Sequence, residues 1–299
     1  MAVTLMRQES PAAIFEEFAS EPEACTISEL YQEDEADALQ FLAARPIHTV
    51  FMASLIRDNG LASPQNRGSF YACRDQHGQL EGVGLLGHAT MIEAQSEAAI
   101  SAFARLTRNC FNAHLIRGER ETINQFWKLY ASPEQTPRFI WREFLLEQKE
   151  TLAPLEPVDD LRRATLDDLD QVLKVNAGLA FQERGINPLN LDPAGFRRRT
   201  ARRIEQGRVW VWIQEERMIF KADVLAETPQ ATYLEGVHIH PEERMKGYGM
   251  RCLTELSSIL FARTESICLT VDQRNKRALA FYAKAGYQFR SEYETFYFQ

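Results

Sequence analysis

A glycine-bearing turn with two basic residues is the clearest place for chemistry in this sequence. The turn, Arg244-Met-Lys-Gly-Tyr-Gly249, lies between a predicted strand and a predicted helix. Such a turn directs successive backbone N–H groups and the positive end of the helix dipole at one point. Its glycines let the backbone approach a ligand closely, and Arg244 and Lys246 add positive charge. We therefore predict an anion site, although two turn glycines beside solvent-facing basic residues would give the same pattern. The turn matches neither the P-loop nor the GxGxxG dinucleotide pattern.

The elements that must position this turn follow from the spacing of apolar residues. Residues 232–240 are rich in β-branched and aromatic residues and predict a strand that Pro241 ends. Apolar residues then recur at three- and four-residue spacing from Met250 to Leu260, which predicts a helix. A buried strand and a helix closed by a glycine follow, at 267–271 and 276–285. In the remainder of this half we expect helices at 167–180 and 193–205, strands at 160–165, 208–214 and 218–226, and one or two closing strands over 287–298.

Two motifs in this order resemble those of the GNAT superfamily of N-acetyltransferases. The turn fits the family's pyrophosphate pattern, (Q/R)xxGx(G/A). The segment from Asn275 to Tyr287 fits its second signature, NxxAxxxYxxxGF, with Tyr287 as the final aromatic residue. The resemblance covers about residues 158–299. It implies an α/β (α+β) fold in which a central mixed, largely antiparallel sheet is flanked by helices.

The resemblance also implies acetyl-CoA as the cosubstrate, with no metal. Its pantetheine is expected to pair like an extra strand with the backbone of Val237, His238 and Ile239. Asn275 is expected near the pantetheine or the thiol end. The pyrophosphate would be held by the backbone of the turn, whose residues are Arg244, Met245, Lys246, Gly247, Tyr248, Gly249 and Met250.

Tyr282 occupies the position of the general acid in this family. The implied mechanism is direct attack of an amine on the thioester, so the leaving thiolate needs a proton from a nearby weak acid. A tyrosine with an ordinary pKa of about 10 stays protonated at neutral pH and can supply that proton. The alternative is that Tyr282 is only a core aromatic residue beside Phe281.

Glu235 is the one carboxylate within the predicted strand and the candidate base, acting through water. By alternation its side chain shares a side with Val237 and Ile239 unless a bulge intervenes, and His238 lies opposite. We expect His238 and His240 to be structural, and a strand N–H near Val237 to stabilise the oxyanion. The alternative is that Glu235 only orients a cationic substrate or pairs with an arginine.

The first half of the chain resembles the second at an offset of 154 residues. Residues 114–130 then align with 268–284, strand with strand and helix with helix, which suggests a tandem repeat. At this offset Gly247 and Gly249 meet Glu93 and Gln95, Asn275 meets Glu121, and Tyr282 meets Lys128. We therefore predict an arm at 1–25, a degenerate GNAT-like domain at 26–152 that has lost CoA binding, and an acetyltransferase domain at 158–299. Within the first domain we expect strands at 27–31, 69–74, 80–88 and 138–147 and helices at 34–44, 47–58 and 97–108.

Composition limits the remaining possibilities. The chain has 299 residues, enough for two domains, and 45% of them are hydrophobic. Its net charge of −8 lies entirely in residues 1–154, which disfavours nucleic acid as a partner. The basic run at 197–203 is interpreted as the solvated face of a helix. No membrane helix or secretory signal is expected. Five scattered cysteines without metal-ligand spacing favour reduced, mostly buried thiols in the cytoplasm: Cys25, Cys73, Cys110, Cys252 and Cys268.

Two functions are compatible with these motifs. The first is an acetyl-CoA-dependent N-acetyltransferase acting on a primary amine of a small molecule, an amino acid or a peptide. The second is a non-catalytic protein that binds acyl-CoA and regulates or recruits. Asn275 and Tyr282 favour the enzyme. The acceptor is expected to be set by the loop at 181–195 and by the partner domain. A homodimer stays open.

Overall fold

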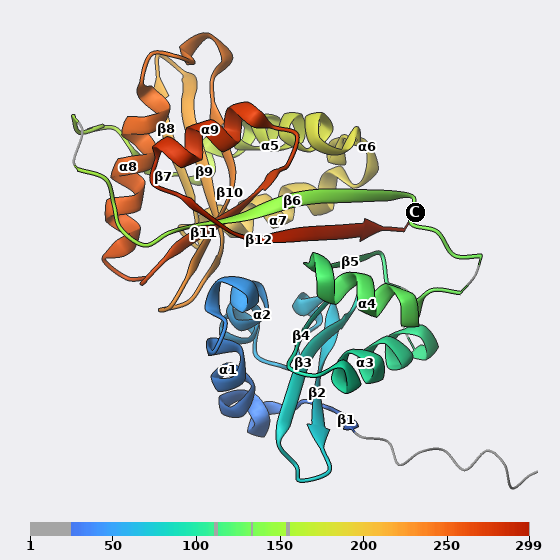
Figure 1. Cartoon of the computed structure of the whole chain (residues 1–299). Helices are drawn as coiled ribbons and strands as arrows, with labels where there is room; N and C mark the ends of the chain where they lie inside the picture. The colour runs from blue at the N-terminus through green and yellow to red at the C-terminus, as the bar shows by residue number, and fades with distance from the viewer. Residues whose placement is uncertain (1–24, 111–112, 133, 154–155, 299) are drawn as a thin grey trace, which may run out of the picture.

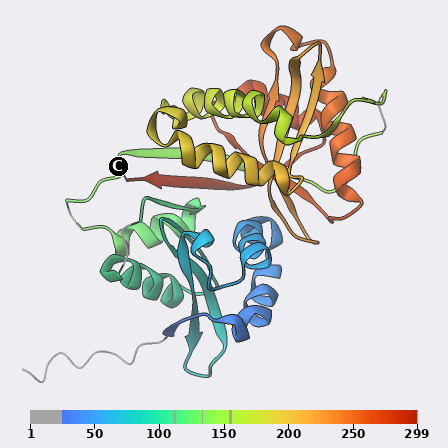
Figure 2. The same cartoon turned by 180° about the vertical axis from the view of Figure 1, so that it is seen from behind.

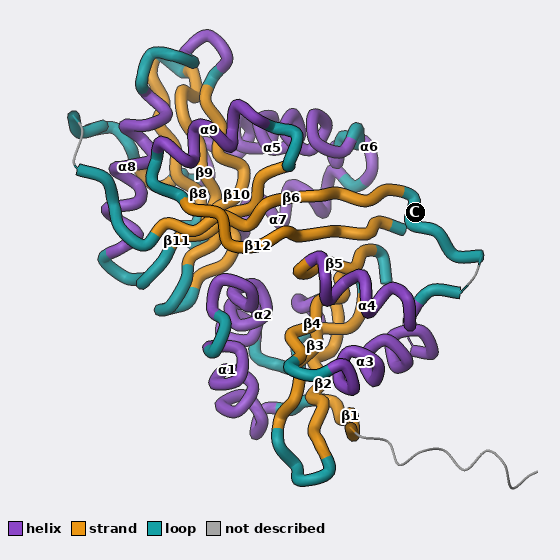
Figure 3. The backbone as a smooth tube through the Cα atoms, viewed as in Figure 1, coloured by secondary structure: helices purple, strands orange, loops and turns teal. Residues whose placement is uncertain are grey.

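A computed structural model describes residues 25–110, 113–132, 134–153 and 156–298, without the side chains of Cys110 and Arg184. The arm predicted for residues 1–25 lies outside the described residues except for Cys25, and so does the predicted thiol of Cys110. The other four cysteines are free and buried, as predicted. Across the described ranges, twelve strands join in one sheet in the order β1-β2-β3-β4-β5-β12-β6-β11-β10-β9-β8-β7 (Figures 1 and 3).

The N-terminal half contains the predicted helices and strands, within a few residues at their ends. Its turns of 3-10 helix are Gln32–Asp34 and Pro64–Asn66. Its helices are α1 (Glu35–Ala43), α2 (Pro46–Asn59), α3 (Glu97–Cys110) and α4 (Arg120–Tyr130). Its strands are β1 (Cys25–Glu29), β2 (Gly68–Asp75), β3 (Leu80–Gly87), β4 (Ala89–Ala94), β5 (Leu115–Glu119) and β6 (Phe139–Gln148). Strand β4 is the element that the sequence reasoning did not separate.

The C-terminal half repeats this order. Its turns of 3-10 helix are Leu166–Asp168 and Pro241–Glu243. Its helices are α5 (Leu169–Arg184), α6 (Pro188–Leu191), α7 (Pro193–Glu205), α8 (Tyr248–Phe261) and α9 (Lys276–Lys284). Its strands are β7 (Arg162–Arg163), β8 (Val209–Gln214), β9 (Arg217–Glu227), β10 (Thr232–Ile239), β11 (Ile267–Asp272) and β12 (Gln288–Tyr297). The first predicted strand shortens to two residues, and the closing segment forms one strand.

Helices cover both faces of the C-terminal part of the sheet. Helices α8 and α9 pack against one face through Leu253, Leu256 and Tyr282 (Figure 1). Helices α5 and α7 pack against the other face through Val172, Leu173 and Ile204 (Figure 2). Helix α2 of the N-terminal half also contributes to a core with strands of the C-terminal half, because Val50 and Phe51 cluster with Tyr233 and Cys268.

The two halves share their closing strands. Strand β12 lies between β5 of the N-terminal half and β6, while β6 lies between β12 and β11 of the C-terminal half (Figure 1). Each closing strand therefore completes the hydrogen bonding of the sheet in the other half. The predicted domain limits at 152 and 158 stay a prediction, but the pairing of main-chain groups crosses them.

Side chains of the closing strands also pack into the core of the other half. Phe296 of β12 is 2% exposed and belongs to the core of the N-terminal half, where its ring meets that of Trp127 edge to face at 5.2 Å. Phe289, on the same strand, is 54% exposed. The two phenylalanines thus separate the contribution of β12 to the other half from a general effect on the strand.

We predict that Phe296→Ala lowers the free energy of unfolding by about 3–5 kcal/mol, because it leaves a cavity in the N-terminal core. The control Phe289→Ala should cost about 1 kcal/mol or less, since that side chain is largely in solvent. Urea unfolding followed by tryptophan fluorescence measures both. Equal costs for the two variants would contradict a stabilising role of β12 in the N-terminal half.

Candidate active site

The site is built around an opening between two neighbouring strands. Strands β10 and β11 are parallel and pair in two register positions, Thr232 with Ile267 and Tyr233 with Cys268. Beyond Tyr233, β10 continues to Ile239 and β11 to Asp272 without further pairing between them in the described residues. One edge of β10, from Glu235 to Ile239, therefore offers backbone groups that no strand of the described sheet occupies. This edge includes the predicted pantetheine-binding residues Val237, His238 and Ile239.

A β-bulge interrupts β10 at the mouth of this opening. Glu235 pairs with Asp223 and His238 pairs with Lys221, so three steps along β10 oppose two along β9. Gly236 lies in the bulge with φ +59°, a conformation that favours glycine. A Cβ atom at this position would lie 2.8 Å from the Nζ of Lys221. Glycine is therefore favoured here by its backbone conformation, and a larger residue would also displace the end of the Lys221 side chain.

The bulge corrects the sidedness predicted by simple alternation. Val237 and Ile239 pack toward the core under α8 and α9. Glu235 lies on the opposite face, and His238 shares that face with it, because their partners Asp223 and Lys221 are two residues apart. The prediction that Glu235 sides with Val237 excepted a bulge, and the extra residue of this bulge shifts the alternation and puts Glu235 on the other face. Burial, with Arg244 and Lys221 nearby, lowers the pKa of His238 to about 4, so this histidine is neutral at pH 7.

Glu235 lies beside a cluster of charges. Its Oε2 is 3.8 Å from Nη1 of Arg203, and that same nitrogen is 3.1 Å from Oδ2 of Asp223. The Nζ of Lys221 is 2.7 Å from Asp223 Oδ2, and the lysine side chain has no exposed surface. Burial lowers the pKa of Lys221, and Asp223 opposes that effect. The carboxylate of Glu235 itself remains about half exposed.

Sequence reasoning missed three members of this cluster. Lys221 and Asp223 are charged residues inside the otherwise apolar strand β9, and that anomaly was the signal that could have found them. Arg203 was assigned to the solvated face of a helix. The structure corrects this in part: Arg203 pairs with the buried Asp223, and Arg202 donates to Asn59 Oδ1 at 3.0 Å.

The predicted anion turn lies between β10 and α8, and its two glycines have different structural reasons. Gly247 has φ +85° and is the N-cap of α8, and a Cβ atom there would meet nothing within 4 Å. Gly249 is needed for a different reason, because its Cβ would lie 3.0 Å from Cδ1 of Ile239. The N–H groups of Met250 and Arg251 donate to the carbonyl of Gly247 at 3.1 and 3.2 Å, whereas those of Tyr248 and Gly249 precede the first helical acceptor. Met245 is 91% exposed and also has positive φ, 65°.

The basic side chains of the turn are partly engaged. Lys246 donates to Glu243 Oε2 at 2.8 Å and holds the pKa of that carboxyl below its usual range. Arg244 donates from Nε to the carbonyl of Ile239 at 3.2 Å and ties the turn to the end of β10. Tyr248 packs its ring edge to face on Trp212 at 5.0 Å. An anion at this turn would therefore depend on backbone N–H groups more than on free lysine or arginine charge.

Asn275 and Tyr282 lie at the start and in the middle of α9. Asn275 is the N-cap, and its Oδ1 accepts a hydrogen bond from the N–H of Ala278 at 3.0 Å. Tyr282 is 9% exposed and its ring lies between those of Phe281 and Tyr287. Burial raises the pKa of Tyr282, and the charge of Glu183 adds to this. The hydroxyl therefore stays protonated well above neutral pH.

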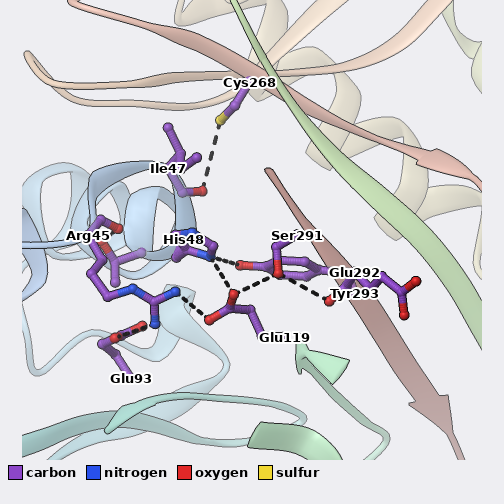
Figure 4. Close-up of polar contacts among 10 residues, drawn as sticks. Arg45, Ile47, His48, Glu93, Glu119, Cys268, Ser291, Glu292 and Tyr293 are labelled. Atoms are coloured by element: carbon purple, nitrogen blue, oxygen red, sulfur yellow. Dashed lines mark hydrogen bonds and ion pairs between the residues drawn. The ribbon is translucent and has the colours of Figure 1, made fainter. Parts of the chain in front are cut away.

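The N-terminal half has a corresponding opening, but it is spanned by ion pairs. Strands β4 and β5 pair at Ala89 and Thr90 and then separate. Arg45, the N-cap of α2, pairs with Glu93 at 3.0 Å and also with Glu119, one residue on each diverging strand (Figure 4). These pairs connect the two strands across the opening.

The turn that would hold an anion is absent from this half. Only Gln95 and Ser96 connect β4 with α3, whereas residues 240–247 connect β10 with α8. The alignment at a fixed offset was therefore wrong locally, because Glu93 belongs to β4 and faces Arg45, so it is no counterpart of Gly247.

No group of His, Cys, Asp or Glu in the described residues could hold a metal ion. Within the same residues, no helix combines the length and the apolar character needed to cross a membrane.

Comparison with known proteins agrees with this architecture. Residues 220–296 match the family model described as FR47-like protein. No curated protein matches the chain. A GNAT-family acetyltransferase from Colwellia psychrerythraea shares 13% identity at a TM-score of 0.55 and covers 92% of this chain and 100% of its own. A GCN5-related N-acetyltransferase from Sphaerobacter thermophilus shares 10% identity at a TM-score of 0.53, covering 92% and 95%.

A tandem GNAT protein from the clavulanic acid biosynthesis pathway shares 13% identity at a TM-score of 0.53 and covers 91% of this chain and 98% of its own. At these identities the likeness concerns the fold, which extends over both halves. The family model, in turn, matches the segment that holds β10, the turn and α9. With two halves of like topology and this match in the second, the chain has the fold of these acetyltransferase structures, and residues 220–296 are similar to the FR47-like family.

Proposed function

We propose that this protein is an acetyl-CoA-dependent N-acetyltransferase that acetylates a primary amine of a small molecule, an amino acid or a peptide. The observation that carries the proposal is the opening between β10 and β11, which exposes a strand edge beside the glycine turn of α8. An extended chain that ends in a diphosphate fits this combination of a free strand edge and a helix N-terminus. Acetyl-CoA has that shape and supplies the activated acetyl group as a thioester.

The residues of the chain divide the binding between them. The backbone of Val237, His238 and Ile239 would pair with the pantetheine along the free edge of β10. The N–H groups of the turn from Arg244 to Met250 would hold the pyrophosphate. Asn275 acts at this site through the start of α9, because its side chain caps that helix.

Two side chains can move the protons that acyl transfer requires. Tyr282 donates a proton to the departing thiolate, since burial keeps its hydroxyl protonated. Glu235 accepts a proton from the amine, directly or through water, and its exposure allows the amine to approach. The bulge places Glu235 on the face away from α8, so the amine and the acetyl donor approach the opening from opposite faces of the sheet.

The acceptor would approach beneath the C-terminal end of α5. Leu179 lies 3.8 Å from the position of a Cβ atom at Gly236, so α5 overlies the bulge. Phe181 and Leu191, in the segment predicted to choose the acceptor, are 58% and 73% exposed. We propose the cytoplasm as the place of action and an amine, rather than nucleic acid or a membrane, as the partner. A homodimer stays a prediction.

A panel of amines tests the proposal against the non-catalytic alternative. Released CoA thiol is detected with 5,5′-dithiobis(2-nitrobenzoate), and thermal unfolding is recorded with and without acetyl-CoA. An enzyme releases CoA with at least one amine. A binding protein is stabilised by acetyl-CoA without turnover. If acetyl-CoA neither stabilises the protein nor is turned over with any amine, both functions are contradicted.

We predict that Gly247→Glu weakens acetyl-CoA binding by about tenfold or more, because it puts a carboxylate at the helix N-terminus where the diphosphate is expected. The positive φ of this residue adds a backbone cost of about 1 kcal/mol to the unfolding free energy. Gly78→Glu is a matched control, since Gly78 has φ +78° and equally open surroundings in the N-terminal half. Calorimetry on the two folded variants measures the affinity, and an equal effect of both would remove the assignment of the turn.

We predict that Tyr282→Phe lowers kcat and kcat/KM together by about 10- to 100-fold, with little change in acetyl-CoA affinity. The lost hydroxyl would act mainly in the transition state, and the ring still packs. Because burial raises the pKa of Tyr282, the wild-type rate should not fall on deprotonation of this group until the pH exceeds its ordinary value of 10. The control is Tyr287→Phe, which changes a neighbouring buried tyrosine. A raised KM with unchanged kcat in Tyr282→Phe would show that this residue binds the donor instead.

A further inference from the structure

Arg117 of the N-terminal half reaches the opening between β10 and β11 in the C-terminal half. It lies on β5, and its side chain crosses one face of the curved sheet. It meets one residue from each of the next four strands: Tyr293 of β12, whose ring centroid lies 5.9 Å from its guanidinium carbon; Glu143 of β6, at 3.2 Å; Thr270 of β11, at 3.0 Å; and Tyr233 of β10, at 3.1 Å. A single guanidinium thus connects the first half to both diverging strands of the second.

The contacts on β10 and β11 lie at the point where these strands part. Tyr233 belongs to the last register pair, and Thr270 is two residues beyond its partner Cys268. One nitrogen, Nη2 of Arg117, donates to both hydroxyls, which are also hydrogen bonded to each other at 2.7 Å. Thr270 in turn donates to Glu143 Oε1 at 2.6 Å. This network bridges the strands immediately before the bulge at Gly236.

The charges in this network balance each other. Glu143 is 8% exposed and balances the charge of Arg117, whose side chain is 20% exposed. Burial lowers the pKa of Arg117, but attraction by Glu143 together with the nearby tyrosines raises it overall. Phe51 of α2 lies against the guanidinium, 5.7 Å from the ring centroid. Displacing the guanidinium would separate it from Glu143 and from both hydroxyls, and a buried charge without its partners is costly.

We propose that Arg117 is a positioning residue that fixes the separation of β10 and β11 and so aligns the strand edge that carries Glu235 and Val237. This inference rests on the proposed function, because it assigns to the N-terminal half a part in the acetyl-transfer site of the other half. Arg117 touches neither reacting group, and it acts through Tyr233, which lies two residues before Glu235 on the same face. The N-terminal half therefore completes the site without binding acetyl-CoA itself.

The test compares Arg117→Met with a control in the full-length chain. Arg208→Met is the matched control: Arg208 also joins the halves, through Asp58 at 2.6 and 2.8 Å, and its side chain is 16% exposed. Its pair with Asp58 does not involve β10 or β11. Arg117→Met should lower kcat/KM by about 10- to 100-fold and acetyl-CoA affinity by about threefold or more, as expected when reacting groups move by about 1 Å. Arg208→Met should leave both within about twofold. Amide hydrogen exchange of residues 235–239 should accelerate in Arg117→Met alone.

Further variants separate positioning from stability. Arg117→Lys keeps a charge for Glu143 but loses the planar fork, so it should regain thermal stability without regaining the rate. If Arg117→Met does not fold, Tyr233→Phe with Thr270→Val removes the two bridged hydroxyls and keeps the ion pair, and it should show the same loss of rate. A folded Arg117→Met with wild-type rate, affinity and exchange would overturn the inference, as would equal losses in Arg208→Met. If the wild type acetylates no amine, the proposed function fails, and acetyl-CoA affinity and exchange still decide the role of Arg117.

Discussion

The pairing of β6 with β12 is the constraint on which the rest of the structure depends. These antiparallel strands close the two halves of the chain, and each is hydrogen bonded to the other half as well as to its companion. One continuous sheet results, so the two halves cannot be displaced relative to each other without breaking main-chain hydrogen bonds. Because the sheet is continuous, a side chain on β5 can lie across β12 and β6 and reach β11. The cross-connection by Arg117 is thus a consequence of strand order.

The opening in the C-terminal half depends on two local departures from regular sheet structure. Strands β10 and β11 stop pairing after two register positions, which frees a backbone edge, and the bulge at Gly236 turns Glu235 away from the face that α8 covers. A regular strand would place Glu235 with Val237, against the apolar core. The bulge therefore places a carboxylate on one face and the core-packed Val237 on the other, beside the same free strand edge. A Cβ atom at Gly236 would lie 2.8 Å from the Nζ of Lys221, so a larger residue there would displace this lysine from its place beside Asp223.

Much of this could be predicted from the sequence, because helices, strands and the turn from Arg244 to Gly249 have local signals. The spacing of apolar residues gave α8 correctly, and the glycines marked the turn that starts it. Features that depend on distant partners could not be predicted. Gly236 is visible in the sequence, but its effect on sidedness depends on the register with β9. The order of β5, β12, β6 and β11 in the sheet has no local signal in the sequence. The contacts of Arg117 with residues on these strands could therefore not be predicted.

The two openings differ in the side chains that span them, and in the described residues only the second leaves a free strand edge beyond its bridge. In the first half, Arg45 joins Glu93 to Glu119 between the diverging strands, and a two-residue connection replaces the long turn before the helix. Ion pairs between strands occupy the place where an extended ligand would need free backbone. In the second half, Arg117 bridges the strands only at Tyr233 and Thr270, where they begin to part, and leaves the edge beyond them free. Arg117, at the base of the second opening, holds its two strands at one separation. Arg45 spans the first opening and closes it.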